Sequence, residues 1–307
     1  MNRFLRDAAA AALCCAAATV AMADDGTSPG CASGAAANAS KLDDYSLKTP
    51  LAVVGLTAGG QLVCFGDRKP EKTWVIGTVG GFTGSDARLI GIDFRPQDGA
   101  LYGVGNAGGL YRVDTAGAML TPIGQLTTVP DPAATAFGVD FNPAANALRI
   151  VSNTGQNLRQ SFANLGTVNP LAATAVDGTL GYTANATPGA TASGVLGAAY
   201  TNNDLAAATA TSLLVLDASL AQVALQSPAN AGFLVATGKL GVAPTAGGFD
   251  IYSVLRGGVT VAQRALASIV VGGVAGLYDI DLLTGLAASR GSFGAMVVDI
   301  AVPLNQF

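Results

Sequence analysis

The sequence predicts an all-β fold, a β-propeller of five four-stranded blades closed into a ring. The first observation is an internal repeat, because ten of the 24 residues between Gly91 and Asp114 are identical to the residue 47 positions later. The second is that short β-rich runs alternate with Gly, Pro, Asn and Asp turns along the chain. A period of about 40 to 50 residues built in this way is typical of one blade per repeat.

The N-terminus predicts export. Arg3 and Arg6 precede an apolar run, and Ala21-Met22-Ala23 forms a cleavage site. We therefore expect the mature protein in the periplasm or outside the cell. The expected division of the chain is a signal peptide over residues 1–23, a flexible leader of small polar residues over 24–49, and a single propeller domain over 50–307.

Four cysteines are present, and two of them lie in the signal peptide at Cys14 and Cys15. Cys31 in the leader and Cys64 in the run QLVCFG would then be the cysteines of the exported protein. An oxidising compartment favours a disulfide between them, and the alternative is a buried thiol at Cys64 with an exposed one at Cys31.

The first blade supplies three short runs rich in β-branched residues, and a fourth strand is missing there. The second blade is complete, and the third follows its plan from Ala136 to Ser161 before a looser stretch that ends at Ser193. The expected strands of the first two blades lie at residues 51–57, 61–66 and 73–79, and at 89–96, 100–106, 109–114 and 119–126.

Blades four and five are identified by further β-rich runs, at residues 195–202, 212–218 and 233–241, and at 247–255 and 276–285, followed by 286–293. The last run, Ala295 to Pro303, matches the opening strand of the other blades. We therefore expect the C-terminal strand to complete the first blade, so that no long sheet edge is left open.

Several motifs resemble a family of secreted bacterial proteins known as domain of unknown function 4394. They are GLTAGGQLVCF, LIGIDFRPQDGALYGVG, FGVDFNP, LRIVSNTGQNLR, AAYTNN and GFDIYSV, and the resemblance covers nearly all of Leu51 to Pro303. The resemblance implies an extracytoplasmic, propeller-like domain, and it brings no reaction and no catalytic residues.

Composition excludes several functions. The chain contains no histidine, which removes His-based catalysis and His-ligated metal sites. Removing residues 1–23 leaves 14 basic and 19 acidic residues, a net charge of −5, so nucleic acid and acidic membrane surfaces are poor partners. Every apolar run after residue 25 is interrupted, so we expect no membrane insertion, and we expect a monomer.

Four aspartates recur at one repeat position on the innermost strands, namely Asp93, Asp140, Asp250 and Asp299. They can line the central channel as a site for a cation such as Ca²⁺, or act as acid and base in a glycosidase-like hydrolase, since the only glutamate, Glu71, lies in an outer loop. The alternative that we favour is a structural aspartate hydrogen-bonded to a neighbouring turn. Replacing Asp93 or Asp140 by Ala should then destabilise the fold by roughly 1 to 3 kcal/mol.

The hairpin of blade three carries amides, hydroxyls and an extra arginine where blade two has apolar residues and glycines. Such polar density suits a small molecule, glycan or protein ligand, and it equally suits a turn satisfied by its own side chains. The candidate ligand-binding residues are Arg149, Asn153, Gln156, Asn157 and Arg159. We expect Asn157→Ala and Gln156→Ala to cost little stability. The sequence thus favours a secreted, non-enzymatic binding or scaffolding propeller without a required cofactor, with a carboxylate-dependent hydrolase as the alternative.

Overall fold

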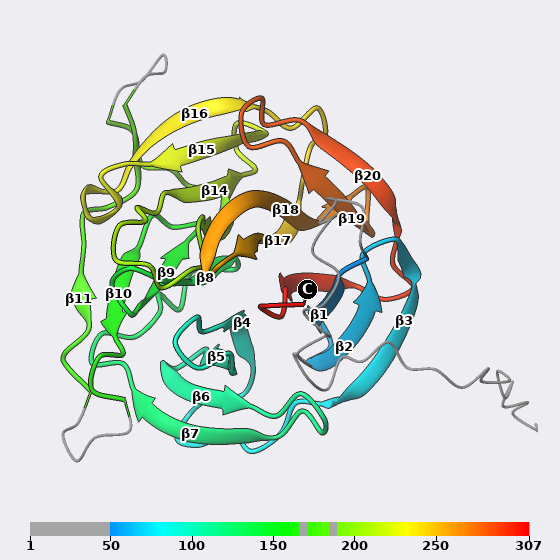
Figure 1. The fold of residues 1–307 in the computed structure, drawn as a ribbon. Coiled ribbons are helices and arrows are strands. Elements are labelled where there is room, and N and C mark those ends of the chain that lie inside the picture. The colour runs from blue at the N-terminus through cyan, green and yellow to red at the C-terminus, as the bar shows by residue number, and fades with distance from the viewer. Residues whose placement is uncertain (1–49, 166–170, 184–188, 307) are drawn as a thin grey trace, which may run out of the picture.

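The computed structural model describes residues 50–165, 171–183 and 189–306, and these form a five-bladed β-propeller. Five sheets, antiparallel except at one outer edge strand, stand around a central axis, with one strand of each sheet innermost (Figure 1). The predicted fold class and blade number are therefore confirmed. Residues 1–49, which include the expected signal peptide and leader, lie outside the described part of the chain.

From the inside outwards, blade one contains β21 (Val297–Ala301), β1 (Ala52–Thr57), β2 (Gln61–Gly66) and β3 (Lys69–Thr78). In the same order, blade two contains β4 (Leu89–Phe94), β5 (Leu101–Gly105), β6 (Gly109–Val113) and β7 (Leu120–Gln125). Blade three contains β8 (Phe137–Asn142), β9 (Ala147–Ser152), β10 (Asn157–Ser161) and β11 (Ala175–Val176).

Blade four contains β13 (Val195–Tyr200), β14 (Leu213–Asp217), β15 (Gln222–Gln226), β16 (Phe233–Lys239) and, parallel to β16 at the outer edge, β12 (Gly181–Tyr182). Blade five contains β17 (Ala246–Arg256), β18 (Val259–Val271), β19 (Val274–Ile280) and β20 (Ala287–Ser292). A short 3₁₀ helix, η1 (Ala229–Ala231), lies between β15 and β16.

The C-terminal strand completes the first blade, as predicted from the strand that this blade lacks at the N-terminus. Strand β21 pairs antiparallel with β1, and Leu56 lies opposite Asp299. The side chain of Gln306 bonds both backbone groups of Ala52, and Asp67 of blade one forms a buried ion pair with Arg264 of blade five. Closure therefore joins the two ends of the described chain through backbone pairing and through side chains.

Glycines of the repeat allow the inner strands to approach each other closely. A Cβ atom at Gly138 on β8 would collide with the backbone nitrogen of Ala198 on β13, and one at Gly248 on β17 would collide with the carboxyl of Asp299 on β21. Each of the described apolar clusters draws its residues from two neighbouring blades. The core therefore lies between the sheets, which explains why the ring has to close to be stable.

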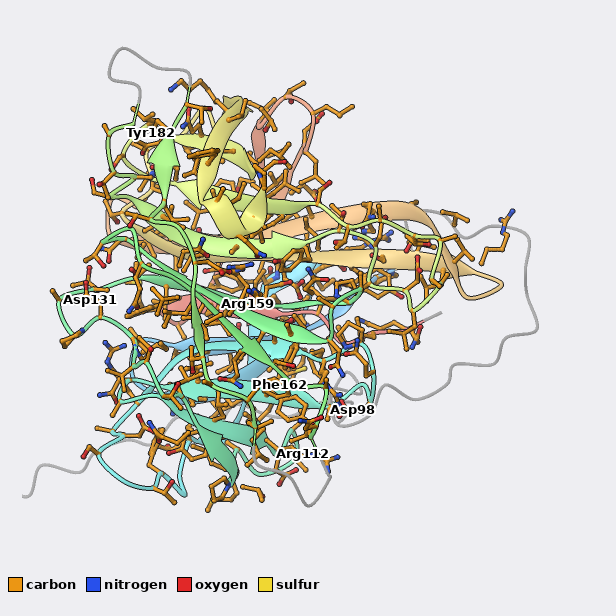
Figure 2. All side chains as sticks on the ribbon, turned by 90° about the vertical axis from the view of Figure 1, so that its left-hand side faces the viewer. Asp98, Arg112, Asp131, Arg159, Phe162 and Tyr182 are labelled. Carbon is orange, nitrogen blue, oxygen red and sulfur yellow. The ribbon has the colours of Figure 1, made fainter. Side chains whose placement is uncertain are left out.

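Some elements differ from the sequence expectation. Strands β15 and β18 are not among the predicted runs, and Glu71 lies on the exposed outer strand β3 rather than in a loop. The hairpin of β17 and β18, drawn in orange, projects beyond the other blades (Figure 2). No helix among the described residues is long and apolar enough to cross a membrane.

Candidate functional site

The four recurring aspartates lie on the innermost strands β4, β8, β17 and β21 and are all buried, with exposed fractions of 6%, 2%, 3% and 8% in chain order. We call them the carboxyl ring. Asp93 accepts hydrogen bonds from the backbone N–H groups of Phe94 and Phe141, both at 2.7 Å. Phe141 lies on the inner strand of the next blade, so this carboxylate joins two blades.

The other three carboxylates join blades in the same way. Asp140 accepts from the N–H of Tyr200 at 2.9 Å, Asp250 from Val302 at 2.5 Å, and Asp299 from Ile92 at 2.9 Å. The sequence pattern predicts that each aspartate bonds a neighbouring turn. That partner is wrong, because each carboxylate accepts a hydrogen bond from the backbone of the next blade instead. Blade four departs from the pattern, since Ala199 on β13 stands at the position of these aspartates.

Burial beside like charges shifts the protonation of the carboxyl ring. Burial raises the pKa of Asp250 to about 6 and that of Asp299 to about 8. Burial also raises the pKa values of Asp93 and Asp140 well above the ordinary range, and the charges of neighbouring ring carboxylates add to the shift. Part of the ring therefore holds protons at neutral pH.

Three members of the ring meet closely enough to be considered as metal ligands. Oxygen atoms of Asp93, Asp140 and Asp250 all lie within 4.8 Å of one another. Carboxylate oxygens suit a hard cation such as Ca²⁺, although a Ca²⁺ site ordinarily supplies about six to eight oxygen ligands. Several of these oxygens already accept backbone hydrogen bonds, so the observed contacts support a structural role for these residues more than a metal-binding role.

A cavity of about 320 Å³ opens at the mouth of the central channel. Four of the five inner strands contribute to it near the ends where they begin, and Asp299 is the member of the carboxyl ring that lines it. The wall is mainly apolar, with Arg88 exposed at the rim. The full lining comprises Leu56, Thr57, Ala58, Gly60, Arg88, Leu89, Ile90, Thr135, Ala136, Phe137, Ala246, Gly247, Val298 and Asp299.

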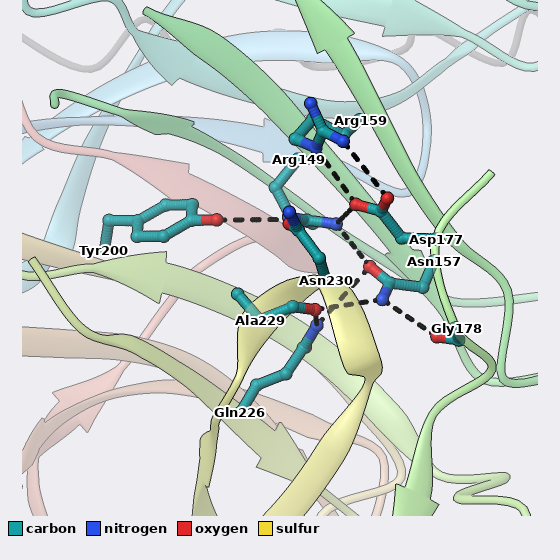
Figure 3. A network of polar contacts seen from close by, with 9 residues as sticks. All are labelled: Arg149, Asn157, Arg159, Asp177, Gly178, Tyr200, Gln226, Ala229 and Asn230. Carbon is teal, nitrogen blue, oxygen red and sulfur yellow. Dashed lines mark hydrogen bonds and ion pairs between the residues drawn. The ribbon is translucent and has the colours of Figure 1, made fainter. Parts of the chain in front are cut away.

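The polar hairpin of blade three belongs to a second buried assembly. Arg149 on β9 is 1% exposed and donates to Asn157 at 2.7 Å, to Asp177 at 2.6 Å and to Asn230 at 2.7 Å (Figure 3). It also contacts the hydroxyl of Tyr200, at 3.3 Å. We call the nine residues drawn in Figure 3 the Arg149 network; they are Arg149, Asn157, Arg159, Asp177, Gly178, Tyr200, Gln226, Ala229 and Asn230.

The network joins blade three to blade four. Asn157 is also 1% exposed and donates to the carbonyls of Gly178 and Ala229, at 2.9 and 3.1 Å. Burial alone would raise the pKa of Asp177, but hydrogen bonds from Arg159 and Arg149 outweigh burial and hold that pKa below its ordinary value. The structure thus commits Arg149 and Asn157 to contacts inside the protein.

The remaining candidates of the hairpin lie nearer the surface. Asn153 accepts from the backbone N–H groups of Thr135 and Ala136, and Gln156 accepts from the N–H of Asp131 at 2.9 Å. Gln156 also lines a shallow hollow with Thr154 and Asp131, and the side chain of Arg159 is 35% exposed. Ligand binding by the five hairpin residues stays a prediction, and Asn153, Gln156 and Arg159 are the members that are partly exposed.

Sequence reasoning did not find the partners of Arg149 or the lining of the cavity. Asp177 and Asn230 lie in stretches without a repeat signal, and the cavity is assembled from strand ends that are far apart in the chain. One signal was present for the network, because Arg149 stands 47 positions after Tyr102 and replaces an aromatic residue in the middle of a buried strand. An arginine there requires buried acceptors.

The ring of five sheets and the channel-mouth cavity define the class of protein, a small β-propeller with a central concave site. Residues 61–301 match the family described as Domain of unknown function (DUF4394), and the chain belongs to that family. The resemblance noted from the motifs is thereby confirmed. No curated protein matches the sequence.

Several solved structures resemble the chain distantly, at low identity. An auxiliary nutrient binding protein from Bacteroides ovatus is 16% identical, with a TM-score of 0.37, and the match covers 58% of this chain and 44% of that one. A protein of unknown function from Bacteroides thetaiotaomicron is 14% identical, with a TM-score of 0.43 and coverage of 84% and 68%. A nidogen/laminin complex chain is 11% identical, with a TM-score of 0.41 and coverage of 84% and 100%.

Proposed function

We propose that this chain is an exported, non-enzymatic propeller that binds a small ligand in the channel-mouth cavity. The observation that carries this proposal is the cavity itself, which is concave, mainly apolar and supplied with a few polar side chains, among them Thr57, Thr135 and Asp299. Its volume of about 320 Å³ lies at the small end of the range that is typical of ligand sites. Scaffolding alone would not require such a hollow.

A hydrolase that uses the carboxyl ring is the alternative, and the contacts favour it less. Glycoside cleavage needs two carboxyl groups that both reach a substrate, with about 5 to 9.5 Å between them. Asp93, Asp140 and Asp250 are buried and are not part of the lining of the channel-mouth cavity. Their oxygens also accept backbone hydrogen bonds that join the blades.

The proposal of export rests on the sequence of residues 1–23. Because an oxidising compartment favours disulfides, export also leads to a separate proposal about Cys31 and Cys64. Cys64 lies buried on β2, while Cys31 is outside the described residues. We propose that they form a disulfide in the exported protein, which closes a loop of about 30 residues. Mass spectrometry of the non-reduced protein, produced by its native export route, tests this pairing. Two free thiols in that sample would contradict it.

The experiment for the binding proposal is a screen of small metabolites, glycans and metal ions on the mature protein, with a hydrolase activity panel on the same sample. The variant Ala58→Trp places a large ring at an exposed position of the cavity lining, and Ala116→Trp is its control at an exposed turn outside that lining. We expect a ligand whose affinity falls at least tenfold in Ala58→Trp and stays unchanged in Ala116→Trp. Binding that survives in Ala58→Trp, or hydrolysis by the wild type, would contradict the proposal.

A further inference from the structure

The floor of the channel-mouth cavity contains one carboxyl group with unused acceptor capacity. Asp299 accepts one hydrogen bond at each oxygen, from the N–H of Ile92 at 2.9 Å and from that of Ile300 at 3.0 Å. A carboxylate offers about four lone-pair positions, so each oxygen can accept a further donor. Because Asp299 lines the cavity, a ligand inside it can supply that donor.

The backbone around Asp299 is built to admit this side chain. A Cβ atom at Gly248 would collide with Asp299, and one at Gly91 would lie 3.3 Å from its second oxygen. Glycine at both positions therefore leaves the carboxyl room between the inner strands of blades two and five. The position of the carboxyl at the cavity floor is consequently determined by the packing of three blades.

The charges around the cavity favour a cation on its floor. Burial is the main cause of the raised pKa of Asp299, and the charge of Asp250 adds to it. The charge of Asp299 in turn adds to the raised pKa values of Asp93 and Asp140. The one basic residue of the lining, Arg88, is exposed at the rim, where water screens its charge. An anion on the floor would be repelled by these carboxylates, whereas a cation relieves their mutual repulsion.

The walls favour an organic cation over a bare metal ion. Leu89, Ile90 and Phe137 are buried side chains of the lining, and they offer apolar contact without oxygen ligands. A hard metal ion seeks several oxygen ligands at once, and an alkyl or aryl group gains by contact with such walls. The ligand that satisfies both floor and walls has an apolar body and one charged nitrogen.

We propose that the channel-mouth cavity binds a small organic ammonium ion, with its nitrogen held at Asp299 and its apolar body against the walls. This inference rests on the proposed function, because it specifies the ligand of the same cavity. Binding then requires ionised Asp299, so that a proton is released when the ammonium ion binds below the pKa of that group, which is about 8.

The test uses three probes of similar shape on the mature full-length protein: phenethylammonium, the neutral 2-phenylethanol and the anionic phenylacetate. Calorimetry should show phenethylammonium binding at least tenfold more tightly than the alcohol, with phenylacetate weakest. The affinity for phenethylammonium should rise about 50-fold between pH 6 and pH 8, because binding releases one proton from a group whose pKa is about 8. Calorimetry in buffers of different ionisation enthalpy should show that about one proton is released when phenethylammonium binds at pH 6.

Asp299→Asn should remove the preference for the ammonium probe, and Asp114→Asn, an exposed carboxylate outside the lining, is the control that should keep it. The pH dependence of the wild type tests the inference even if Asp299→Asn fails to fold. Equal binding of amine and alcohol, lost in Ala58→Trp, would overturn this inference and leave the proposed function intact. Binding of the probes that survives in Ala58→Trp would overturn both this inference and the proposed function. Failure of phenethylammonium to bind would overturn this inference alone.

Discussion

The carboxyl ring and the Arg149 network both join neighbouring blades through buried polar groups, but their electrostatics are opposite. The ring brings like charges together, and each of its carboxylates accepts a hydrogen bond from a backbone N–H group of the next blade. The network places a buried arginine against Asp177 and satisfies the rest of the guanidinium with side-chain oxygens. The same task is thus performed near the axis by repeated residues and farther out by residues that occur once.

The difference has consequences for protonation. Burial raises the pKa values in the ring, while the two arginines hold the pKa of Asp177 below its ordinary value. The ring therefore favours the folded state most at low pH, and the network loses part of its contribution when Asp177 is protonated. Five perturbations test these regions, in order of the expected effect of each variant or of one pH unit, from the largest to the smallest.

Deleting Ala295 to Phe307 removes β21 together with Asp299, and it should abolish the soluble fold. The deletion exposes the edge of β1 and the apolar side chains that pack against Val297 and Ile300. Solubility and thermal unfolding measure the effect, with a chain that lacks only Phe307, and so keeps the Gln306 contacts to Ala52, as control. A truncated protein as soluble and as thermostable as the parent would refute the role of the closing strand.

Arg149→Met should destabilise the protein by about 3 to 5 kcal/mol. Asp177 would keep only its partly exposed partner Arg159, and the oxygen of buried Asn157 would keep only its longer contact with Gln226, at 3.4 Å. Arg159→Met is the matched control, since that side chain is 35% exposed and its ion pair is worth about 1 kcal/mol or less. Urea unfolding of both variants measures the difference. Equal destabilisation would mean that the buried guanidinium has no special role.

Asp93→Ala and Asp140→Ala should each cost about 1 to 3 kcal/mol, because backbone N–H groups of the next inner strand lose their acceptor. The loss is smaller than for Arg149, since removing one carboxylate also relieves repulsion within the ring. Exposed Asp114→Ala serves as the control in thermal unfolding. Wild-type stability combined with lost metal binding or lost hydrolysis would favour the carboxylate-site alternative.

The ring should also make the protein more stable in mild acid than in mild alkali. The pKa values of Asp250 and Asp299 rise from 3.8 in the unfolded chain to about 6 and about 8, so the folded state binds more protons and loses stability as pH rises from about 4 to 8. We expect the free energy of unfolding to fall by on the order of 1 kcal/mol per pH unit in this window.

Melting curves at pH 5 to 8 with a chelator present measure this dependence, because a bound cation would offset the repulsion. Asp299→Asn should flatten the curve between pH 6 and 8. A melting temperature that increases from pH 5 to pH 8 under these conditions would contradict the protonation of the ring.

The smallest effect is expected at the surface of the blade-three hairpin. Gln156→Ala should cost less than about 1 kcal/mol, because its contacts are partly exposed. The sequence-based expectation for Asn157→Ala has to be revised, since Asn157 is buried and its amide bonds two carbonyls and Arg149. With these contacts we expect about 1 to 3 kcal/mol for Asn157→Ala. Similar melting temperatures for the two variants would contradict this distinction.

The sequence by itself determined the number of blades, the closing strand and the position of the four aspartates. Turn residues and alternating apolar runs are local signals, and the 47-residue repeat places Asp93 and Asp140 at equivalent points of neighbouring inner strands. Strand β18 escaped prediction because its second half, residues 264–270, is buried on both faces and lacks a clear alternation.

Only the tertiary structure decided what those residues contact. The sequence does not reveal that Asp93 accepts a hydrogen bond from the N–H of Phe141, or that Arg149 donates one to Asn230. Both contacts depend on how far one blade is rotated against the next. The channel-mouth cavity likewise draws on residues from Leu56 to Asp299, which meet only when the ring closes. Side-chain pairing across blades is a property of packing distance and angle, and the local pattern of a sequence does not specify either.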